Sequence, residues 1–477
     1  MSAETTTLVW FRRDLRLVDH PGVRAAADAG SAVFLFVVDP ALLARRHHAA
    51  PARLRFLRAG LQALDAELAE RGSRLIVREG RPEEVVPAVA AEAAASIVSW
   101  TREVSPLGRA RDERVQAALE AARIETRPRA GDLVAEPEDL PGSSGRGYLV
   151  FTPFSRIWRD HSLPAHIPAP AHIAGPALPT AGLDRLPPGD PPLPAGAPAA
   201  RRRLVEFIRS GRADEYAEGR DLPGEDATSH LSAYLRFGMC TGAQIGRALG
   251  LPGLLSPGRE AFWRQICWRE FFHHHLARHP EVARMALRED LRAIEWNDDP
   301  AEIAAWEAGE TGYPIVDAGM RQLAQTGWIH NRARMVVASF LVKDLLIDWR
   351  RGESVFMRSL VDGDPASNNG GWQWVAGTGT DAAPYFRVLN PTRQAERFDP
   401  DGDYIRRFVP ELRGVPVRRI HEPWRMTAEE QGADGCRIGS DYPMPRVDHR
   451  ERRELLLERY RRAREAASSP GAGAPEV

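Results

Sequence analysis

The sequence predicts an α/β domain with a doubly wound parallel sheet, then a long linker and a larger all-α domain. Residues 5–132 alternate short runs rich in β-branched and aromatic residues with segments of helical spacing. Strands separated by helices in this way are typical of a parallel sheet. From residue 200 to 465 nearly every segment has apolar residues at helical intervals, which predicts helices. A chain of 477 residues is also too long for one core.

Four runs in the α/β part are predicted strands: TLVWFRRD, AVFLFVVD, RLIVREG and SIVSWTRE. Leucines recur at helical spacing between the second and third runs, from Leu54 to Leu68, and predict a helix there. No GxGxxG motif follows the first strand. The domain is therefore not an ordinary dinucleotide-binding half.

Residues 133–199 are rich in proline and alanine, as in LPPGDPPLPAGAPAA, and are predicted to form an extended connector without a core of its own. In the helical domain, DDPAEIAAWEAGE shows acids and a proline where a helix should start and a glycine just past its end. The stretch ASSPGAGAPEV near the end predicts a disordered tail over residues 466–477.

Composition excludes several classes of protein. No long apolar run and no N-terminal signal pattern occur, so we expect a cytoplasmic protein without membrane segments. Cys240, Cys267 and Cys436 are too far apart for a disulfide framework or a metal signature. The net charge of -1 argues against general coating of nucleic acid but allows a local basic groove. Because Lys343 is the only lysine, phosphate contacts would be made by planar guanidinium groups.

Two predicted helices each carry polar and aromatic side chains on one face. The segment FWRQICWREFF (262–272) aligns an amide, an indole, a cation and a phenyl ring, namely Gln265, Trp268, Arg269 and Phe272. The helix predicted over 328–349 aligns Asn331, Arg334, Met335 and Ala338, with Arg332 beside them.

A third segment, DGDPASNNGGWQWVAGTGTD (362–381), shows no helical or alternating pattern and is predicted to be a glycine-rich loop carrying two tryptophans. Any one such stripe could be ordinary core packing. Three in the same half of the chain favour a site for a planar ligand, since rings give contact area and a few donors give orientation.

The run His273, His274 and His275 raises the possibility of a metal site. Consecutive helical residues point about 100° apart, so these three cannot converge on one ion. His275 and His279 are correctly spaced but lack an acidic or cysteine partner. We therefore expect a solvated helix end and no metal.

Several longer motifs resemble the DNA photolyase and cryptochrome family, most closely class I cyclobutane pyrimidine dimer photolyases. They are WFRRDLRLVDH, TSHLSAYLRFG, WREFF, TGYPIVDAGMRQL, NRARMVVASFLVKDLL and DGDPASNNGGWQW with DAAPYFRVLNP. The resemblance spans both domains. It implies a light-dependent DNA-repair enzyme, a deoxyribodipyrimidine photo-lyase, and we expect it to act as a monomer on UV-damaged DNA.

The resemblance further implies FAD bound in the helical domain. The positions that match flavin contacts of the family are Tyr216, Thr228, Ser229, His230, Leu231, Ser232, Phe262, Gln265, Arg269, Trp328, Asn331, Arg334, Asp362, Gly363, Asp364 and Asn368. His230 stands where the family commonly has arginine, which weakens one cationic contact. Asp362 is expected to pair with Arg334. Asn368 is expected to face flavin N5, and asparagine there favours repair over signalling.

The implied reaction is electron transfer from excited reduced FAD to a dimer flipped out of the duplex, which splits the cyclobutane ring. Trp372, Trp349 and Trp296 match the tryptophan chain that photoreduces the flavin, so the implied catalytic residues are these three and Asn368. The implied DNA-binding residues are Arg220, Gln265, Trp268, Asn331, Arg332, Met335, Trp374 and Gln394. Gln265 departs from the glutamate usual in class I enzymes, but an amide can still donate a hydrogen bond.

The α/β domain is expected to hold an antenna chromophore, either 8-hydroxy-5-deazaflavin or 5,10-methenyltetrahydrofolate. The motifs FRRDLR and WTREVSPLGRARD belong to that region in relatives and do not decide between the two. One alternative function is a cryptochrome-type photoreceptor, which usually carries a long C-terminal extension. Another is a nicotinamide-dependent flavoprotein reductase, which would need a second nucleotide fingerprint.

Overall fold

The computed structural model describes residues 5–44, 49–142, 145–381 and 387–468. The chain divides into two compact units. Unit 1 comprises residues 1–217, 228–280 and 361–366, and unit 2 comprises residues 218–227, 281–360 and 367–477. These bounds differ from the predicted domains because residues 228–280 pack with the α/β part. The limits predicted from the sequence, at residues 132, 199 and 465, stay a prediction.

Unit 1 contains a five-stranded parallel sheet in the order β3-β2-β1-β4-β5. The strands are β1 Thr5–Phe11, β2 Gly30–Val38, β3 Leu75–Glu79, β4 Ile97–Thr101 and β5 Glu125–Arg129. The first four confirm the four predicted runs. β5, with the sequence ETRPR, is a mostly exposed edge strand without apolar alternation, so its sequence carries no strand signal.

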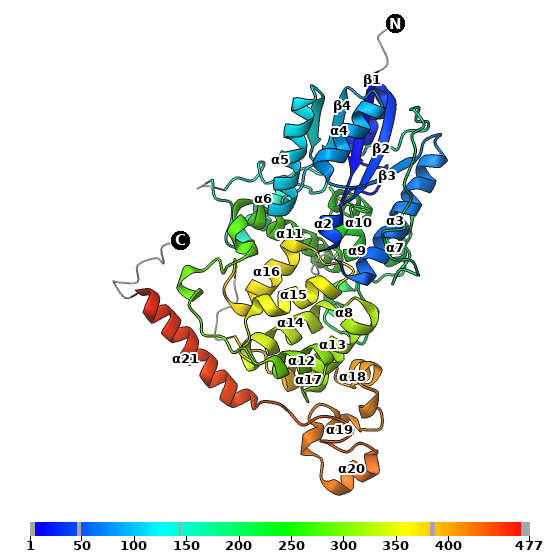
Figure 1. Ribbon diagram of the computed structural model, residues 1–477. Helices are drawn as coiled ribbons and strands as arrows, with labels where there is room; N and C mark the ends of the chain where they lie inside the picture. The colour runs from blue at the N-terminus through cyan, green and yellow to red at the C-terminus, as the bar shows by residue number, and fades with distance from the viewer. Residues whose placement is uncertain (1–4, 45–48, 143–144, 382–386, 469–477) are drawn as a thin grey trace. The chain divides into compact units, whose positions relative to one another are not determined.

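The helices that follow the strands are α1 Pro21–Asp28, α2 Pro40–Leu43, α3 Pro51–Ala69, α4 Pro82–Glu92 and α5 Pro106–Ala121. The order of the strands reverses direction at β1, and right-handed crossovers then place α4 and α5 on one face of the sheet and α3 on the other (Figure 1). Leu8 and Trp10 of β1 pack in one buried cluster with Val89 of α4 and Val115 of α5.

The remaining helices of unit 1 are α6 Phe151–Asp160, α7 Ala197–Arg209, α9 Ser232–Arg236, α10 Gly242–Leu249 and α11 Pro257–Arg278, while α8 Tyr216–Gly219 crosses into unit 2. Residues 133–199 were predicted to be an extended connector without a core of its own, and part of this stretch is instead helix α6. α6 buries Phe154 and Trp158, and Glu270 of α11 accepts hydrogen bonds from Trp158 Nε1 at 2.6 Å and from the backbone of Val134 at 2.7 Å. Phe154 and Trp158 are buried because α6 packs against α11, which lies far along the chain.

Unit 2 is helical. Its α-helices are α12 Pro300–Ala308, α13 Pro314–Thr326, α14 Asn331–Ser339, α15 Trp349–Ser359, α16 Pro365–Ala376, α17 Pro391–Phe398, α18 Asp403–Phe408, α19 Val417–Ile420, α20 Ala428–Asp434 and α21 His449–Ser468. Shorter turns are η1 Pro280–Ala283, η2 Glu289–Leu291, the π-helical η3 Phe340–Asp344, η4 Pro410–Leu412 and η5 Pro423–Arg425. The predicted signals at α12 are confirmed: Asp299 caps its start and Gly309 ends it with φ 68°.

The segment 362–381 was predicted to be a loop, and this was wrong, because its central part is helix α16. Ala366, Asn369, Trp372, Gln373, Val375 and Ala376 are all buried. The helix has no periodic signal because polar Asn369 and Gln373 are buried while Trp374 is partly exposed, so apolar residues do not mark the buried face. The motif continues through residues 382–386, which lie outside the described residues.

The helix predicted over 328–349 is also interrupted. α14 continues into the π-turn η3, the chain leaves helical geometry after Asp344, and Trp349 begins α15. At the end of the chain α21 extends to Ser468, past the start of the predicted tail, and residues 469–477 lie outside the described residues. Among the described helices none combines the length and the apolar character needed to cross a membrane.

Candidate functional site

The segment Thr228–Ser232 forms a tight turn in unit 1. His230 has φ 51°, a left-handed conformation, and the hydroxyl of Ser229 accepts a hydrogen bond from the backbone of Leu231 at 3.4 Å. Arg203 donates from its Nε to the carbonyl oxygen of Ser229 at 3.1 Å. Ser229 and Leu231 are buried, whereas Ser232 is exposed. Thus four predicted contact residues belong to one ordered turn, and Ser232 begins α9.

Tyr216 and Phe262, both predicted flavin contacts, meet in an aromatic cluster. Their ring centroids lie 5.2 Å apart, and Phe207 completes the cluster at 5.0 Å from Phe262. Phe262 stands near the start of α11, and Gln265 follows one turn later with its side-chain amide donating to the carbonyl oxygen of Ala261 at 3.2 Å. The cluster gives this part of α11 a rigid apolar support.

Trp268 lies flat against Phe151 of α6, with ring centroids 3.7 Å apart and planes 3° apart. Its side chain is half-buried. The ring centroid of Phe272, expected on the same stripe, lies 5.6 Å from that of Trp268. Phe151 was not predicted as a site residue, because only the tertiary fold brings the linker to α11. A tryptophan fixed from behind by a second ring is a preformed platform for stacking.

Arg269 is held by two acceptors, Asp132 at 3.1 Å and the carbonyl oxygen of Leu235 at 3.4 Å. Its Nη1 and the Nη1 of Arg236 are buried and have no hydrogen-bond partner among the described residues. Burial, together with the charge of Arg13, lowers the pKa of Arg236 to about 9. Two buried cationic groups near the end of α9 therefore retain N–H donors for an anion.

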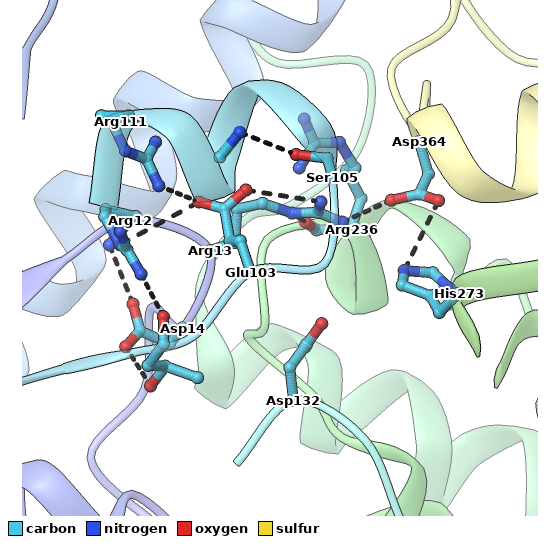
Figure 2. A network of polar contacts seen from close by, with 12 residues as sticks. Arg12, Arg13, Asp14, Glu103, Ser105, Arg111, Asp132, Arg236, His273 and Asp364 are labelled. Atoms are coloured by element: carbon cyan, nitrogen blue, oxygen red, sulfur yellow. Dashed lines mark hydrogen bonds and ion pairs between the residues drawn. The ribbon is translucent and has the colours of Figure 1, made fainter. Parts of the chain in front are cut away.

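A network of charges covers the carboxyl ends of β1 and β4 (Figure 2). Arg13, which follows β1, pairs with Asp364 and lies 3.8 Å from Glu103, which follows β4. Arg111 of α5 donates to Glu103 at 2.6 Å. Burial alone would raise the pKa of Glu103, but Arg111, Arg12 and Arg13 hold it well below its usual range. The motifs FRRDLR and WTREVSPLGRARD, which were predicted to belong to one region, thus contact each other.

The three consecutive histidines of α11 correct another expectation. His273, His274 and His275 are 2%, 5% and 5% exposed, so the predicted solvated helix end was wrong. α11 packs against the linker, and His274 donates from Nε2 to the carbonyl oxygen of Ala135 at 2.7 Å. Among the residues that the structure describes, no group of three potential metal ligands occurs.

In unit 2, Asn368 lies on α16 and is 8% exposed. Its Nδ2 donates to the carbonyl oxygen of Glu353 at 3.0 Å. A carbonyl oxygen only accepts, so the nitrogen of the amide must face it and Oδ1 is left for another partner. Asn369 donates to the Glu353 carboxylate at 3.2 Å and accepts from Gln373 at 3.1 Å. This ladder, which the sequence gave no sign of, fixes the start of α16.

The three tryptophans of the predicted chain all lie in unit 2. Trp372 and Trp349 are each 2% exposed, while Trp296 is half-buried and lies 6.3 Å from Tyr460. Trp372 contacts Phe356 at 5.0 Å and Trp306 at 6.1 Å. Neither of these two rings was predicted as a neighbour of Trp372.

The predicted DNA-contact arginines of unit 2 meet at one acid. Asp221 pairs with Arg332 at 2.8 Å and lies 3.8 Å from Nε of Arg220. Arg332 also stands over the ring of Phe398 at 4.1 Å, and Gln394 lies one turn before Phe398 on α17. Three segments far apart in the sequence therefore meet here, through Asp221, Arg332 and Phe398.

The other predicted residues of unit 2 lie on α14, just before α14, or on α16. Asn331 is exposed and donates to the sulfur of Met335 at 3.9 Å. Arg334 donates to the carbonyl oxygen of Ile329 at 2.9 Å. Trp328 and Trp374 are half-buried. Asp362 and Arg334 belong to different units, so their pairing stays a prediction.

The chain combines a unit that contains a parallel sheet with a helical unit. Its buried Arg236 and Arg269 have N–H donors suited to an anionic ligand. Two family models match: "DNA photolyase" over residues 7–171 and "FAD binding domain of DNA photolyase" over residues 262–462. A deoxyribodipyrimidine photo-lyase of Halobacterium salinarum is 42% identical and is covered over 99% of its length by 96% of this chain.

Solved structures of photolyases are also similar to this chain. A class III photolyase from Agrobacterium tumefaciens superposes with a TM-score of 0.91 at 38% identity, covering 98% of this chain and 99% of that one. A photolyase from Sulfolobus tokodaii with two FAD molecules superposes with a TM-score of 0.83 at 31% identity, covering 96% of this chain and 100% of that one. The chain belongs to the DNA photolyase family.

The residues of unit 1 fit the FAD that this family binds. The pyrophosphate of FAD is an anion, and Nη1 of Arg236 and Nη1 of Arg269 are two buried donors without a hydrogen-bond partner among the described residues. The turn at Thr228–Ser232 also offers hydroxyls and backbone amides as donors. Arg203 donates hydrogen bonds to the carbonyl oxygens of Ser229 and Thr228 in this turn. Hydrogen-bond donors at this place match the chemistry of the cofactor.

Proposed function

We propose that this chain is a deoxyribodipyrimidine photo-lyase, which uses light to split cyclobutane pyrimidine dimers in UV-damaged DNA. Photo-lyases with the same activity in their names match it at 35–43% identity over nearly its whole length. The observation on the molecule itself that carries the proposal is Trp268, held flat on Phe151 and one turn from Gln265. That arrangement suits stacking and hydrogen bonding to a pyrimidine ring.

The energetic case rests on stacking. Photolyases act on bases extruded from the duplex, and extrusion costs a few kcal/mol, least where a damaged base already stacks poorly. Stacking on an aromatic side chain is worth about 1–3 kcal/mol per base. Stacking on Trp268, and on Trp374 as a second proposed contact, would offset the cost for a damaged dinucleotide but not for a sound one. The lesion would therefore be selected by its weak stacking.

Bound FAD supplies an electron donor that light can excite. The chain's own residues hold it: Arg236 and Arg269 neutralise its phosphates, and Tyr216 and Phe262 give apolar support. Asn368 offers its Oδ1 because Nδ2 is already bonded to the carbonyl oxygen of Glu353. Asn368 would thus accept a hydrogen bond from a protonated ring nitrogen.

Trp372, Trp349 and Trp296 are proposed as the path along which electrons reach oxidised flavin. Their burial supports this order, since the first two are almost fully buried and Trp296 is partly exposed to solvent. Surface reductants would then contact Trp296.

Arg220, Arg332 and Gln394 are proposed to contact DNA phosphates, which fix position rather than sequence. Asp221 holds both arginines in place when DNA is absent. Trp328, Asn331, Arg334 and Met335 complete the flavin and lesion contacts in this proposal.

An antenna chromophore is proposed at the carboxyl ends of β1 and β4, which is where ligands bind in doubly wound sheets. The charge network around Glu103 and Arg13 supports that position. The candidates remain 8-hydroxy-5-deazaflavin and 5,10-methenyltetrahydrofolate, with a second FAD added by the Sulfolobus tokodaii photolyase. The absorption spectrum of the purified protein and mass spectrometry of the released chromophore will distinguish the three.

The decisive experiment irradiates the reduced protein with an oligonucleotide that contains one thymine dimer and follows the absorbance of restored thymine. Light-dependent recovery is expected, with none in the dark. Bound reduced flavin without recovery would contradict repair and favour a photoreceptor. Flavin reduction by a nicotinamide in the dark would instead favour a reductase. A monomer in the cytoplasm is part of the same proposal, and sedimentation of the purified protein tests the first point.

A further inference from the structure

An apolar stripe is exposed on α6 and the two residues before it. Eight large apolar side chains are exposed among the described residues, and three of them, Leu149, Val150 and Ile157, fall within nine residues. Each of the three is 46–48% exposed. Val150, Pro153 and Ile157 stand at i, i+3 and i+7, so these exposed residues share one face of the helix. Single exposed apolar residues are ordinary, but a stripe of them indicates a contact surface.

This α6 stripe, formed by Leu149, Val150, Pro153 and Ile157, is held in place by its surroundings. The buried face of α6 packs against α11 through three aromatic side chains, Phe151, Phe154 and Trp158. On the other side of Leu149, the carbonyl oxygen of Gly145 accepts a hydrogen bond from Nη1 of Arg278 at 3.0 Å. Because the chain is tied to α11 on both sides of the stripe, a partner that binds there would cost little conformational entropy.

The α6 stripe adjoins the platform that is proposed for the extruded lesion. Phe151 directly follows Val150 in the chain, and its ring stacks on Trp268 with centroids 3.7 Å apart. The guanidinium group of Arg264 stands over the same Phe151 ring at 5.3 Å. The stripe, Phe151 and Trp268 all belong to unit 1. Surface and platform are therefore neighbouring parts of one compact unit.

The charges around the α6 stripe suit a polyanion. Residues 145–159 contain three arginines and no acidic residue. Arg146 and Arg156 are exposed, whereas Arg159 pairs with Glu260 of α11. Apolar side chains between guanidinium groups fit a nucleic-acid strand, because the cations bind phosphates and the apolar groups contact unstacked bases. A second copy of the chain would bring the same cations together, and like charges repel.

We propose that the α6 stripe is a wedge that holds a damaged duplex open beside the lesion. Leu149 and Val150 contact the bases that lose their stacking when the dinucleotide leaves the duplex, while Arg146 and Arg156 bind phosphates of the same strand. Proteins that distort DNA insert leucine, isoleucine or proline side chains in this way. The inference rests on the proposed function and extends it, since Trp268 would bind the lesion and the stripe would bind the DNA around it.

The test measures binding by the holoenzyme in the dark, through fluorescence anisotropy of a strand that carries one thymine dimer, with and without its complement. Only the duplex has paired neighbours that must be held apart. The double variant Leu149→Ser, Val150→Ser should bind the damaged duplex about tenfold more weakly, because the exposed half of each side chain loses its apolar contact. Its affinity for the damaged single strand should change by less than about twofold, since stacking on Trp268 is retained.

Leu254→Ser is the matched control, since Leu254 is an exposed leucine of unit 1 outside the stripe. It should bind both forms of DNA as the wild type does. Leu149→Met keeps an apolar side chain and should keep most of the affinity for the damaged duplex. Thermal unfolding followed by circular dichroism should give the same midpoint for all of these variants, because the altered side chains are exposed.

The phosphate contacts are tested separately. Arg156→Gln should weaken binding to damaged and undamaged duplexes alike and should reduce the slope of log affinity against log salt by about one. An unchanged slope would remove Arg156 from the proposed surface.

Equal loss of affinity for the damaged duplex and the damaged single strand, or no loss for either, would overturn the wedge. If the wild type binds damaged and undamaged duplexes equally, the inference and the proposed function both fail. Selective binding and light-dependent repair that the double variant retains in full would count against the wedge alone. A wild-type dimer that the double variant converts to a monomer in sedimentation would assign the stripe to a second copy of the chain and refute the inference.

Discussion

Gly352 is a position where one added methyl group should disturb Trp372, the first member of the proposed electron path. It lies on α15, where a Cβ would stand 2.0 Å from Cη2 and 2.4 Å from Cζ3 of Trp372, and 2.6 Å from Leu341. Trp372 is 2% exposed and contacts Phe356 and Trp306. The indole therefore has no free space into which it could move.

The expected loss of stability follows from two opposing terms. Overpacking a core costs about 1–3 kcal/mol, and a contact this short puts Gly352→Ala at the upper end. Alanine regains about 1 kcal/mol of helix propensity over glycine. The net cost should be about 1–2 kcal/mol in the free energy of unfolding.

A double-mutant cycle with Trp372→Phe, followed by urea unfolding and circular dichroism, isolates this contact. Phenylalanine lacks the ring atoms that clash, so in that background Gly352→Ala should meet only Leu341 and cost less, and the coupling should be about 1–2 kcal/mol. Gly371→Ala is the control, because its Cβ would meet no atom within 4 Å. Strictly additive costs, or equal destabilisation by the control, would refute the reasoning.

Three further outcomes are expected. Trp372→Phe should slow photoreduction of oxidised flavin about tenfold or more but leave repair by chemically reduced protein nearly intact; equal loss of both would contradict separate roles. Burial lowers the pKa of His274 to about 4, so the neutral ring is favoured by folding and stability should fall as pH drops from about 6.5 toward 4, by up to about 3 kcal/mol. In His274→Gln the urea midpoint should change less with pH over that window. An unchanged pH dependence would rule out His274 as the cause. Asp221→Asn should release Arg220 and Arg332 for phosphates, raise affinity for DNA several-fold and steepen its salt dependence by about one in slope; fluorescence anisotropy at two salt concentrations checks this, and an unaltered slope would speak against a phosphate role.

The elements that sequence patterns predicted well are those whose signals are local. The four buried strands have continuous β-rich runs, and α12 has its acidic cap and its glycine stop within one short segment. The family motifs also lie in continuous stretches. They were enough to indicate the family and the candidate residues.

The elements that the sequence hid are those whose signals come from distant partners. α16 buries polar residues such as Asn369 and Gln373 and leaves Trp374 partly exposed, and α6 buries Phe154 and Trp158 against α11. The π-turn after α14 and the polar edge strand β5 likewise have no periodic pattern of their own.

By itself the sequence determined the α/β and helical halves and the family, and it indicated candidate residues for flavin and DNA contact. The tertiary structure alone decided that Phe151 backs Trp268, that Gly352 faces Trp372, and that Arg13 and His273 grip Asp364. Arg13 and Asp364 are 351 residues apart. Helix and strand signals depend on neighbours along the chain, whereas the charge state and burial of a side chain depend on groups that only folding brings within a few ångströms.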